Sequence, residues 1–212
     1  MARPASNERK HQLLEAARDL IFTEGAGRFT IRRLATRVGI TEAAVYRHFP
    51  GKEELLLSLL EGMFGRMRLA LRKLVRRSAP AHDRLFTLGR IHLRFLLDAK
   101  VNPLLLFSDA IDPEQPRIRE TLARHLKFFG GAVSSIINQG CRDGSLDPQL
   151  DRPAAARCMV GLLQHAVIRW TITGSTKGLR SGLDASMRML ISGFGARDVP
   201  KAIVGSSSKR PA

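Results

Sequence analysis

The spacing of apolar residues constrains the fold of this 212-residue chain more than any other feature. Along most of the chain, apolar side chains recur at intervals of three and four residues, which is the pattern of helices with one buried face. No segment alternates apolar and polar residues in the manner of a half-buried strand. The sequence therefore predicts an all-α protein. The first apolar stripe contains Leu13, Leu14, Ala17, Leu20 and Ile21.

Glycine and capping residues divide this pattern into separate helices. Gly25 and Gly39 are expected to end the first two helices, because glycine adopts the left-handed conformation of a C-terminal cap without penalty. Thr30 and Thr41 are expected to cap the second and third helices, and the third is expected to run through His48. The remaining predicted helices span residues 52–77, 83–99, 103–111, 114–140, 153–173 and 182–195, with a loop over 141–152.

The chain is strongly basic, with 35 Lys and Arg against 19 Asp and Glu and a formal net charge of +16 at pH 7. Such an excess most often indicates an anionic partner, and nucleic acid is the commonest one. Residues 1–77 carry 16 basic and 8 acidic side chains, whereas residues 78–212 carry 19 and 11. The N-terminal third therefore has the higher charge density and is the better candidate for phosphate contact. The sequence does not explain the excess in residues 78–212.

Composition and the N-terminus exclude several classes of protein. No apolar run approaches the ~18 residues that a membrane-spanning helix needs. The N-terminus is polar and lacks the apolar region of a secretory signal. Two cysteines, Cys141 and Cys158, cannot build a disulfide framework and suit a reducing compartment. We therefore expect a soluble, cytoplasmic protein.

Residues 29–49, with the sequence FTIRRLATRVGITEAAVYRHF, are the most informative segment. Two short helices meet there at a turn that contains glycine, which is the arrangement that places a second helix in the major groove of DNA. Val45 and Phe49 share one face of the second helix, and we expect that face to be buried. Ala43 and Arg47 then point away from the core, where small residues beside an arginine permit close approach to base edges.

Each exposed side chain of this helix suggests a particular DNA contact. Arg47 could bind the O6 and N7 atoms of guanine, and Glu42 could accept a hydrogen bond from cytosine N4. Ala43 or Ala44 could touch a thymine methyl group. Around them, Thr30, Tyr46, His48 and Lys52 occupy positions where side chains of their types could hold phosphates.

Three alternatives to these contacts stay open. Arg32, together with Arg33 and Arg37, could form a solvated face without a partner. Tyr46, the only tyrosine, could belong to the core, and His48 could be a structural cap of the turn that follows the helix.

In this segment the sequence resembles the TetR family of bacterial transcriptional regulators. The shared features are the capped helix TIRRLA at 30–35, the turn VGI at 38–40, the run AVYRHF at 44–49 and the opening KEELL of the fourth helix at 52–56. The resemblance is close over about residues 8–60. It implies a homodimer that binds a palindromic DNA operator, and a C-terminal domain for ligand binding and dimerisation.

The resemblance also implies domain boundaries and DNA-contacting residues. The expected domains are a helix-turn-helix domain with a short basic arm at 1–52, a helical effector and dimerisation domain at 53–195, and a disordered tail at 196–212. The DNA-binding positions that carry over are Thr30, Arg32, Glu42, Ala43, Ala44, Tyr46, His48 and Lys52. Arg47 joins this set from its place on the outward face of the helix.

The C-terminal helices are expected to provide a ligand pocket and a dimer interface. The candidate pocket residues, which could equally be ordinary core, are Phe64, Met67, Phe95, Phe107, Phe128, Met159, His165 and Trp170. The apolar surface of helices 153–173 and 182–195 extends over more than one face, which indicates burial against a second subunit or within one chain's own core. The expected interface residues are Met159, Leu162, Leu163, Ala166, Trp170, Met187, Leu190, Ile191 and Phe194.

The sequence offers little support for catalysis. Cys141 and Cys158 could be paired with His125 or His165, but nothing fixes such a geometry. No cysteine and histidine spacing matches a zinc site, and no glycine-rich phosphate loop is present. We therefore expect no cofactor, no metal and no enzymatic activity.

The sequence predicts a dimeric DNA-binding transcriptional regulator, a repressor that binds a palindromic operator and that a small, largely apolar effector releases. One alternative keeps the fold and makes the protein an effector-independent DNA-binding organiser or an activator. A second alternative is an all-α small-molecule-binding protein or enzyme without specific DNA binding.

Overall fold

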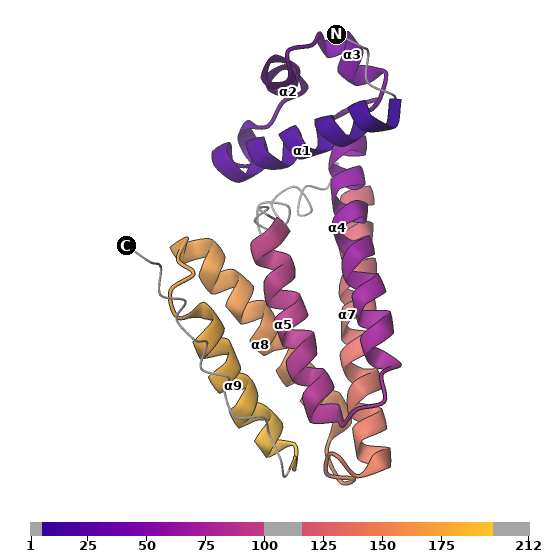
Figure 1. Cartoon of the computed structure of the whole chain (residues 1–212), viewed down its shortest axis with the longest axis vertical. Coiled ribbons are helices and arrows are strands. Elements are labelled where there is room, and N and C mark those ends of the chain that lie inside the picture. The colour runs from indigo at the N-terminus through magenta and orange to yellow at the C-terminus, as the bar shows by residue number, and fades with distance from the viewer. Residues whose placement is uncertain (1–5, 100–115, 197–212) are drawn as a thin grey trace, which may run out of the picture.

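The computed structural model describes residues 6–99 and 116–196, and within these ranges every regular element is helical. The predicted all-α fold is therefore confirmed. Figure 1 shows a small helical head at one end of a long helical body. The helices of the head are α1 (Ser6–Glu24), the 3-10 helix η1 (Ala26–Arg28), α2 (Ile31–Val38) and α3 (Glu42–Tyr46). The helices of the body are α4 (Lys52–Val75), α5 (Ala81–Ala99), α7 (Pro116–Asp143), α8 (Arg152–Thr173) and α9 (Leu179–Gly193).

Local capping interactions set the helices of the head, as the sequence predicts. The Thr30 hydroxyl oxygen accepts a hydrogen bond from the backbone N–H of Arg33 at 3.2 Å, and the Thr41 hydroxyl oxygen accepts one from Ala44 N–H at 3.2 Å. Gly39 ends α2 with φ +72°. These bonds satisfy backbone N–H groups that the first turn of a helix leaves without partners. The two capped helices thus meet at a left-handed glycine.

The third helix is shorter than predicted. Helix α3 ends at Tyr46, and Arg47 and His48 lie in a turn rather than in the helix. The backbone N–H of His48 donates to the carbonyl of Val45 at 2.9 Å, a bond that spans three residues instead of four and tightens the last turn. The segment nevertheless keeps Phe49 beside Val45 in the core, with 1% and 0% of their surfaces exposed.

Two predicted boundaries in the body are wrong by about one turn. Helix α7 continues to Asp143 instead of stopping at residue 140, because buried Cys141 packs its last turn into the core. The predicted loop therefore begins at Gly144, where φ is +78°. Helix α9 begins at Leu179 instead of residue 182, and Leu179 is buried. The predicted helix at 103–111 and residues 197–212 of the predicted tail lie outside the described residues.

The core consists of two hydrophobic clusters that meet along α4 and α7. The head cluster joins apolar residues of α1, α2 and α3 to the N-terminal halves of α4 and α7, where Phe64, Ile118 and Leu122 belong to it. The body cluster begins at Met67, one turn further along α4, and joins α4 and α7 to α5, α8 and α9. The head therefore packs against α4 and α7, the two long helices that also contribute to the core of the body.

Small residues let the helices of the body approach closely. Gly89 on α5 faces the Met187 side chain of α9, and Gly140 on α7 faces Ala81 at the start of α5. A side chain added at either glycine would overlap these neighbours. Among the described helices, none has the length and apolar character needed to cross a membrane.

Candidate functional site

The outer face of α3 carries the side chains that the sequence predicts to contact DNA. Glu42, Ala43 and Arg47 are exposed, and 48% of the Tyr46 surface is exposed. Ala44 is half-buried at the edge of this face. Because Val45 and Phe49 fill the core from the opposite side, the short helix separates a packing face from an accessible face. Tyr46 is therefore not a core residue.

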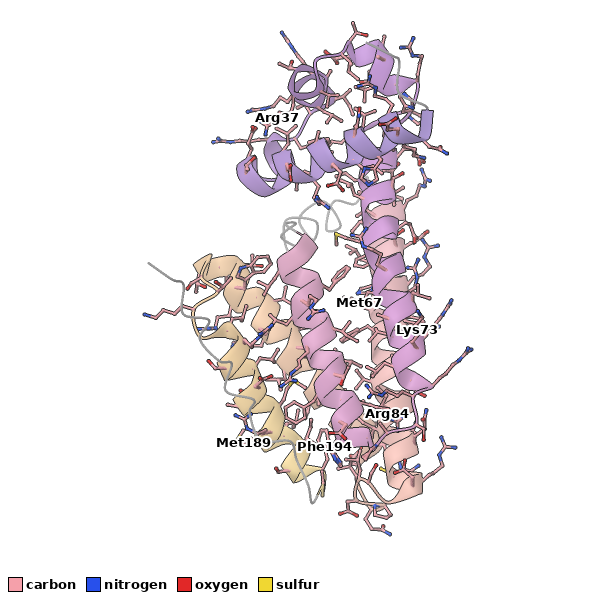
Figure 2. All side chains as sticks on the ribbon, viewed as in Figure 1. Arg37, Met67, Lys73, Arg84, Met189 and Phe194 are labelled. Atoms are coloured by element: carbon pink, nitrogen blue, oxygen red, sulfur yellow. The ribbon has the colours of Figure 1, made fainter. Side chains whose placement is uncertain are left out.

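Four exposed arginines of the head have no internal charge partner. Arg28, Arg32, Arg37 and Arg47 are exposed, and within the described residues none of their guanidinium groups forms an ion pair or a hydrogen bond. Figure 2 shows Arg37 at the periphery of the head. By contrast, Arg33 pairs with Glu24. Arg32, Arg37 and Arg47 thus remain available to an external anion, and Arg28 joins them from a position that the sequence did not single out.

The flanking candidates lie where they could meet a phosphate backbone. His48 and Lys52 are half-buried at the turn after α3 and at the first residue of α4. The Thr30 hydroxyl accepts the capping bond from Arg33 N–H, which leaves its own hydrogen free to donate. Lys10 lies with its ammonium group 5.3 Å from the centre of the Phe49 ring, which brings a basic side chain of α1 to the same region. Lys10 was not among the predicted contacts, because only the packing of α1 against the turn places it there.

Several arginines of the body have structural partners on other helices. Arg84, which Figure 2 shows near the end of the body opposite the head, is buried and donates to the Val75 carbonyl at 3.2 Å and to the Gln139 side chain at 2.6 Å. Arg117 pairs with Glu53 and Glu54, and Arg124 pairs with Glu61. Arg90 lies 3.7 Å from Asp184. Part of the positive charge beyond residue 77 therefore joins helices together.

The predicted pocket residues divide between the two clusters. Phe64 belongs to the head cluster, whereas Met67 and Met159 belong to the body cluster. Phe128 and Trp170 are half-buried against the body cluster, and Phe95 packs against both clusters. Phe107 lies outside the described residues. The structure thus brings most of the candidates to the core along α4, α5, α7 and α8, as ordinary packing would also do.

One predicted pocket residue, His165, is misplaced. Its side chain is exposed and lines a surface pocket with Arg169 and Lys177, between α8 and the start of α9. The buried face of α8 contains Met159, Leu163 and other apolar residues, and His165 lies away from it. His165 is therefore not part of an interior pocket between α4 and its neighbours.

Two interior histidines, His92 on α5 and His125 on α7, have an environment that the sequence did not reveal. Each has 8% of its surface exposed. The His125 ring stacks on Phe64 with a centroid distance of 3.7 Å, and the His92 ring lies 4.9 Å from that of Phe129. Burial, reinforced by the positive charge of Arg68, lowers the pKa of His125 to about 4. Burial and repulsion from His125 lower the pKa of His92 to about 4.

The predicted dimer interface needs a correction. Met159, Leu163, Met187 and Ile191 are fully buried, and Ala166 and Phe194 are also buried, so these side chains belong to the chain's own core. The apolar side chains that do reach the surface of α8 and α9 are Ile168, Ile172 and Met189, with exposed fractions of 42%, 76% and 78%. Figure 2 shows Met189 on the outer side of the molecule. Leu162, Trp170 and Leu190 are half-buried and could contribute to either surface.

No group of three or more His, Cys, Asp or Glu side chains that could hold a metal ion occurs in the described ranges 6–99 and 116–196. The exposed side chains of the head offer electrostatic and hydrogen-bonding contacts.

Comparisons with known proteins agree with this geometry. Residues 13–59 match the family model described as "Bacterial regulatory proteins, tetR family". The chain is 31% identical over 157 residues to the nucleoid occlusion factor SlmA of Marinobacter nauticus, covering 70% of this chain and 75% of that protein. It is 21% identical over 183 residues to the fatty acid metabolism regulator protein of Bacillus subtilis, covering 86% of this chain and 94% of that protein.

The fold is also that of a solved regulator. The structure of the transcriptional regulator FadR from Bacillus subtilis in complex with stearoyl-CoA superposes with a TM-score of 0.69 at 20% identity, covering 86% of this chain and 98% of that chain. The compared proteins are named as regulators or DNA-associated factors and not as enzymes. On its sequence, its helix-turn-helix and these likenesses, the chain belongs to the TetR family of bacterial regulatory proteins, whose members are DNA-binding transcriptional regulators.

Proposed function

We propose that this protein is a homodimeric transcriptional repressor that binds a palindromic operator and leaves it when a small, largely apolar effector binds. The observation that carries the proposal is the division of α3 into a buried face and an exposed face. Val45 and Phe49 anchor the helix, while Arg47, Ala43 and Tyr46 remain accessible. A helix presented in this way suits the major groove of DNA. The head that carries it also holds arginines without internal partners.

We assign the DNA-binding role to residues 1–52, including the nine predicted contact positions. Residues 53–195 form the effector and dimerisation part. The proposed boundary falls at the start of α4, whose first residue is Lys52. Operator DNA in a bacterium lies in the cytoplasm, so we propose that location for the protein.

DNA-affinity selection on genomic fragments with the purified protein tests the proposed function. The expected result is recovery of fragments that share an inverted repeat, because a twofold dimer presents two equivalent recognition helices to two half-sites. Recovery of fragments without a common sequence would contradict the proposed operator binding and favour a helical small-molecule-binding protein.

The dimer is proposed to form through the outer face of α8 and α9. Ile172 on α8 and Met189 on α9 are exposed apolar side chains, which a dimer contact through these two helices would cover. Ile172→Lys is expected to shift the particle mass in native mass spectrometry from two chains to one. Leu69→Lys on α4 is the matched control, because Leu69 is also exposed, at 57%, but lies on another helix. Dissociation by Leu69→Lys with no effect of Ile172→Lys would move the interface to α4.

The apolar effector is supported by the predominantly apolar core of the body and by the likeness to fatty acid regulation in Bacillus subtilis. A similar protein of that organism is named for fatty acid metabolism, and the similar structure of FadR from the same organism was solved with stearoyl-CoA. Stearoyl-CoA is therefore the first probe to add to a complex of this protein with its selected DNA, with coenzyme A as the control. Release by stearoyl-CoA alone is the expected result for an effector with a long apolar chain.

A second candidate function keeps the DNA binding and removes the effector. The observation in its favour is the 31% identity to a protein named as a nucleoid occlusion factor, which exceeds the 21% identity to the fatty acid metabolism regulator. If apolar compounds never release the DNA and the selected sites lie scattered away from promoters, this organising role replaces the repressor.

A further inference from the structure

The contact between the head cluster and the body cluster contains two polar rings. His125 stacks on Phe64, which belongs to the head cluster. His92 lies against Phe129, which belongs to the body cluster. The two imidazoles come from different helices, α5 and α7, and the aromatic partner Phe64 comes from α4. Three helices therefore converge on this polar layer inside an apolar core.

The imidazole nitrogens of this layer lack hydrogen-bond partners. Nδ1 and Nε2 of His92 and Nδ1 of His125 are buried, and none forms a hydrogen bond within the described residues. A buried polar atom without a partner typically costs about 1–3 kcal/mol. Three such atoms at one place are a destabilising feature that internal packing does not explain.

The surrounding charged groups do not supply the missing partners. The charge of Arg68 on α4 disfavours protonation of His125 and so lowers its pKa. The carboxylate of Glu61 is engaged by Arg68 at 2.8 Å and by Arg124 at 3.2 Å. The two histidines form no cluster with a third metal-binding side chain in the part of the chain that the structure describes. An internal ion pair or a metal therefore does not account for the pair.

Both rings are uncharged at neutral pH, since the pKa of each lies at about 4. A neutral imidazole presents one N–H donor and one nitrogen acceptor. Protonation of either ring at pH 7 is therefore disfavoured by burial. A hydroxyl or carbonyl oxygen can accept from the N–H of one ring, and a hydroxyl can also donate to a ring nitrogen of the other. A buried carboxylate would need a cation, and Arg68 is already engaged by Glu61. The layer therefore suits an uncharged oxygen better than a carboxylate.

We propose that His92 and His125 bind the polar group of the effector, and that this effector is an apolar molecule with an uncharged hydroxyl or carbonyl oxygen. This proposal rests on the proposed function and deepens it by naming two ligand-binding residues and a ligand class. The effector's oxygen supplies the hydrogen bonds that the imidazoles lack, and the apolar remainder packs among the neighbouring aromatic side chains.

The position of the two histidines explains how a bound effector could act on the head. Phe64 packs with residues that hold α1, α2 and α3, and Phe129 packs with residues that hold α5, α8 and α9. A molecule inserted at His92 and His125 must separate or tilt these side chains, because interiors are close-packed. The displacement acts on α4, which connects directly to the recognition helix through residues 47–51.

The test uses the whole protein without DNA and two ten-carbon probes. One probe is 1-decanol, which has an uncharged oxygen, and the other is decanoate, which is charged at pH 7. Binding is followed by ring nitrogen shifts of histidines labelled with 15N, assigned with His92→Phe and His125→Phe. The variants His92→Leu and His125→Leu serve in case the larger ring does not fit. His165→Phe is the control, because His165 is exposed and lies on α8.

The expected result is that 1-decanol shifts the nitrogens of His92 and His125 and binds more tightly than decanoate. Loss of either imidazole should weaken 1-decanol binding about three- to tenfold, the equivalent of one hydrogen bond, while His165→Phe binds it like the native protein. The apolar variants should also melt at a higher temperature than the native protein in the absence of any probe, because they remove unpartnered buried atoms.

Two results would overturn the proposal. One is that 1-decanol does not bind up to its solubility limit, or binds tightest when charged as decanoate. The other is that the His92 and His125 variants bind 1-decanol as the native protein does. Neither readout involves DNA, so a protein that fails to select an operator can still bind 1-decanol, and the failures of the two proposals are distinguishable.

Discussion

The head and the body of this molecule differ in where the groups that we propose to bind partners lie. The head buries Val45 and Phe49 and leaves Arg28, Arg32, Arg37 and Arg47 at the surface without internal partners. The body uses several of its surface arginines to join helices and instead hides unpartnered imidazole nitrogens inside. The two proposals follow this difference: DNA would meet the head across its surface, and the effector would enter the interior of the body.

The first prediction has the largest expected effect and tests whether the buried face of the α3 segment holds its exposed face in place. Phe49→Ala removes a ring that is 1% exposed and should destabilise the protein by about 3–5 kcal/mol, measured by urea denaturation. DNA binding should fail together with the structure of the head. Arg47→Ala is the control, since an exposed side chain should change the unfolding free energy by no more than about 0.5 kcal/mol. Equal stability losses in both variants would contradict this division of α3.

The second prediction concerns the interior of the body and its response to acid. The pKa values of His92 and His125 are lowered to about 4 in the folded protein, against 6.5 for the free group. The unfolded chain therefore binds more protons than the folded chain between pH 6.5 and pH 4, and stability falls as the pH decreases through this window. The loss amounts to at most about 3 kcal/mol for each ring.

Unfolding measured at several pH values checks the second prediction, with His92→Phe as the comparison. The variant should lose less stability between pH 6.5 and pH 4 than the native protein, because one titrating group is gone. The same pH dependence in both proteins would show that His92 does not titrate as a buried group.

The third prediction returns to the surface of the head. Arg47→Ala should weaken binding to the selected operator by roughly 1–3 kcal/mol if Arg47 contacts a guanine. Binding to random DNA should change much less, and fluorescence anisotropy on the two DNA molecules measures both. Equal losses on the two would make Arg47 a phosphate contact without a role in sequence recognition.

The smallest expected effect separates phosphate contacts from base contacts. Lys52→Ala should weaken binding to all DNA sequences by a similar factor and reduce the slope of log affinity against log salt concentration by about one. Lys73→Ala is the matched control, because Lys73 is exposed near the other end of the same helix. An unchanged slope for Lys52→Ala would remove this residue from the interface.

Sequence alone could predict the head more fully than the body because the signals of the head are local. Thr30, Gly39 and Thr41 act on backbone groups within four residues of themselves, so their roles follow from their neighbours in the chain. The burial of Val45 and Phe49 follows from helical spacing. The end of α3 at Tyr46 was missed by two residues, because the three-residue bond of His48 depends on the tight turn.

The body depends on contacts between helices that spacing does not determine. Helix α8 is apolar over a wide arc, so the pattern could not decide which side packs inward, and buried Met159 was assigned to an interface. His165 was placed inside for the same reason and lies outside. The roles of His92 and His125 could not be predicted, because they depend on contacts between helices. The Phe64 ring beside His125 comes from α4, and the Phe129 ring beside His92 comes from α7, so these contacts form only when the three helices pack.

Hydroxyl-radical footprinting of the native protein on its selected DNA tests the central claim most directly, namely that the exposed face of α3 reads operator DNA in a twofold assembly. The account predicts two protected segments related by the inverted repeat, centred about one helical turn apart or a multiple of it. Ala43→Glu, which adds a charge to the exposed face without touching the core, should abolish both segments. A single protected segment, or protection that Ala43→Glu leaves intact, would contradict the account.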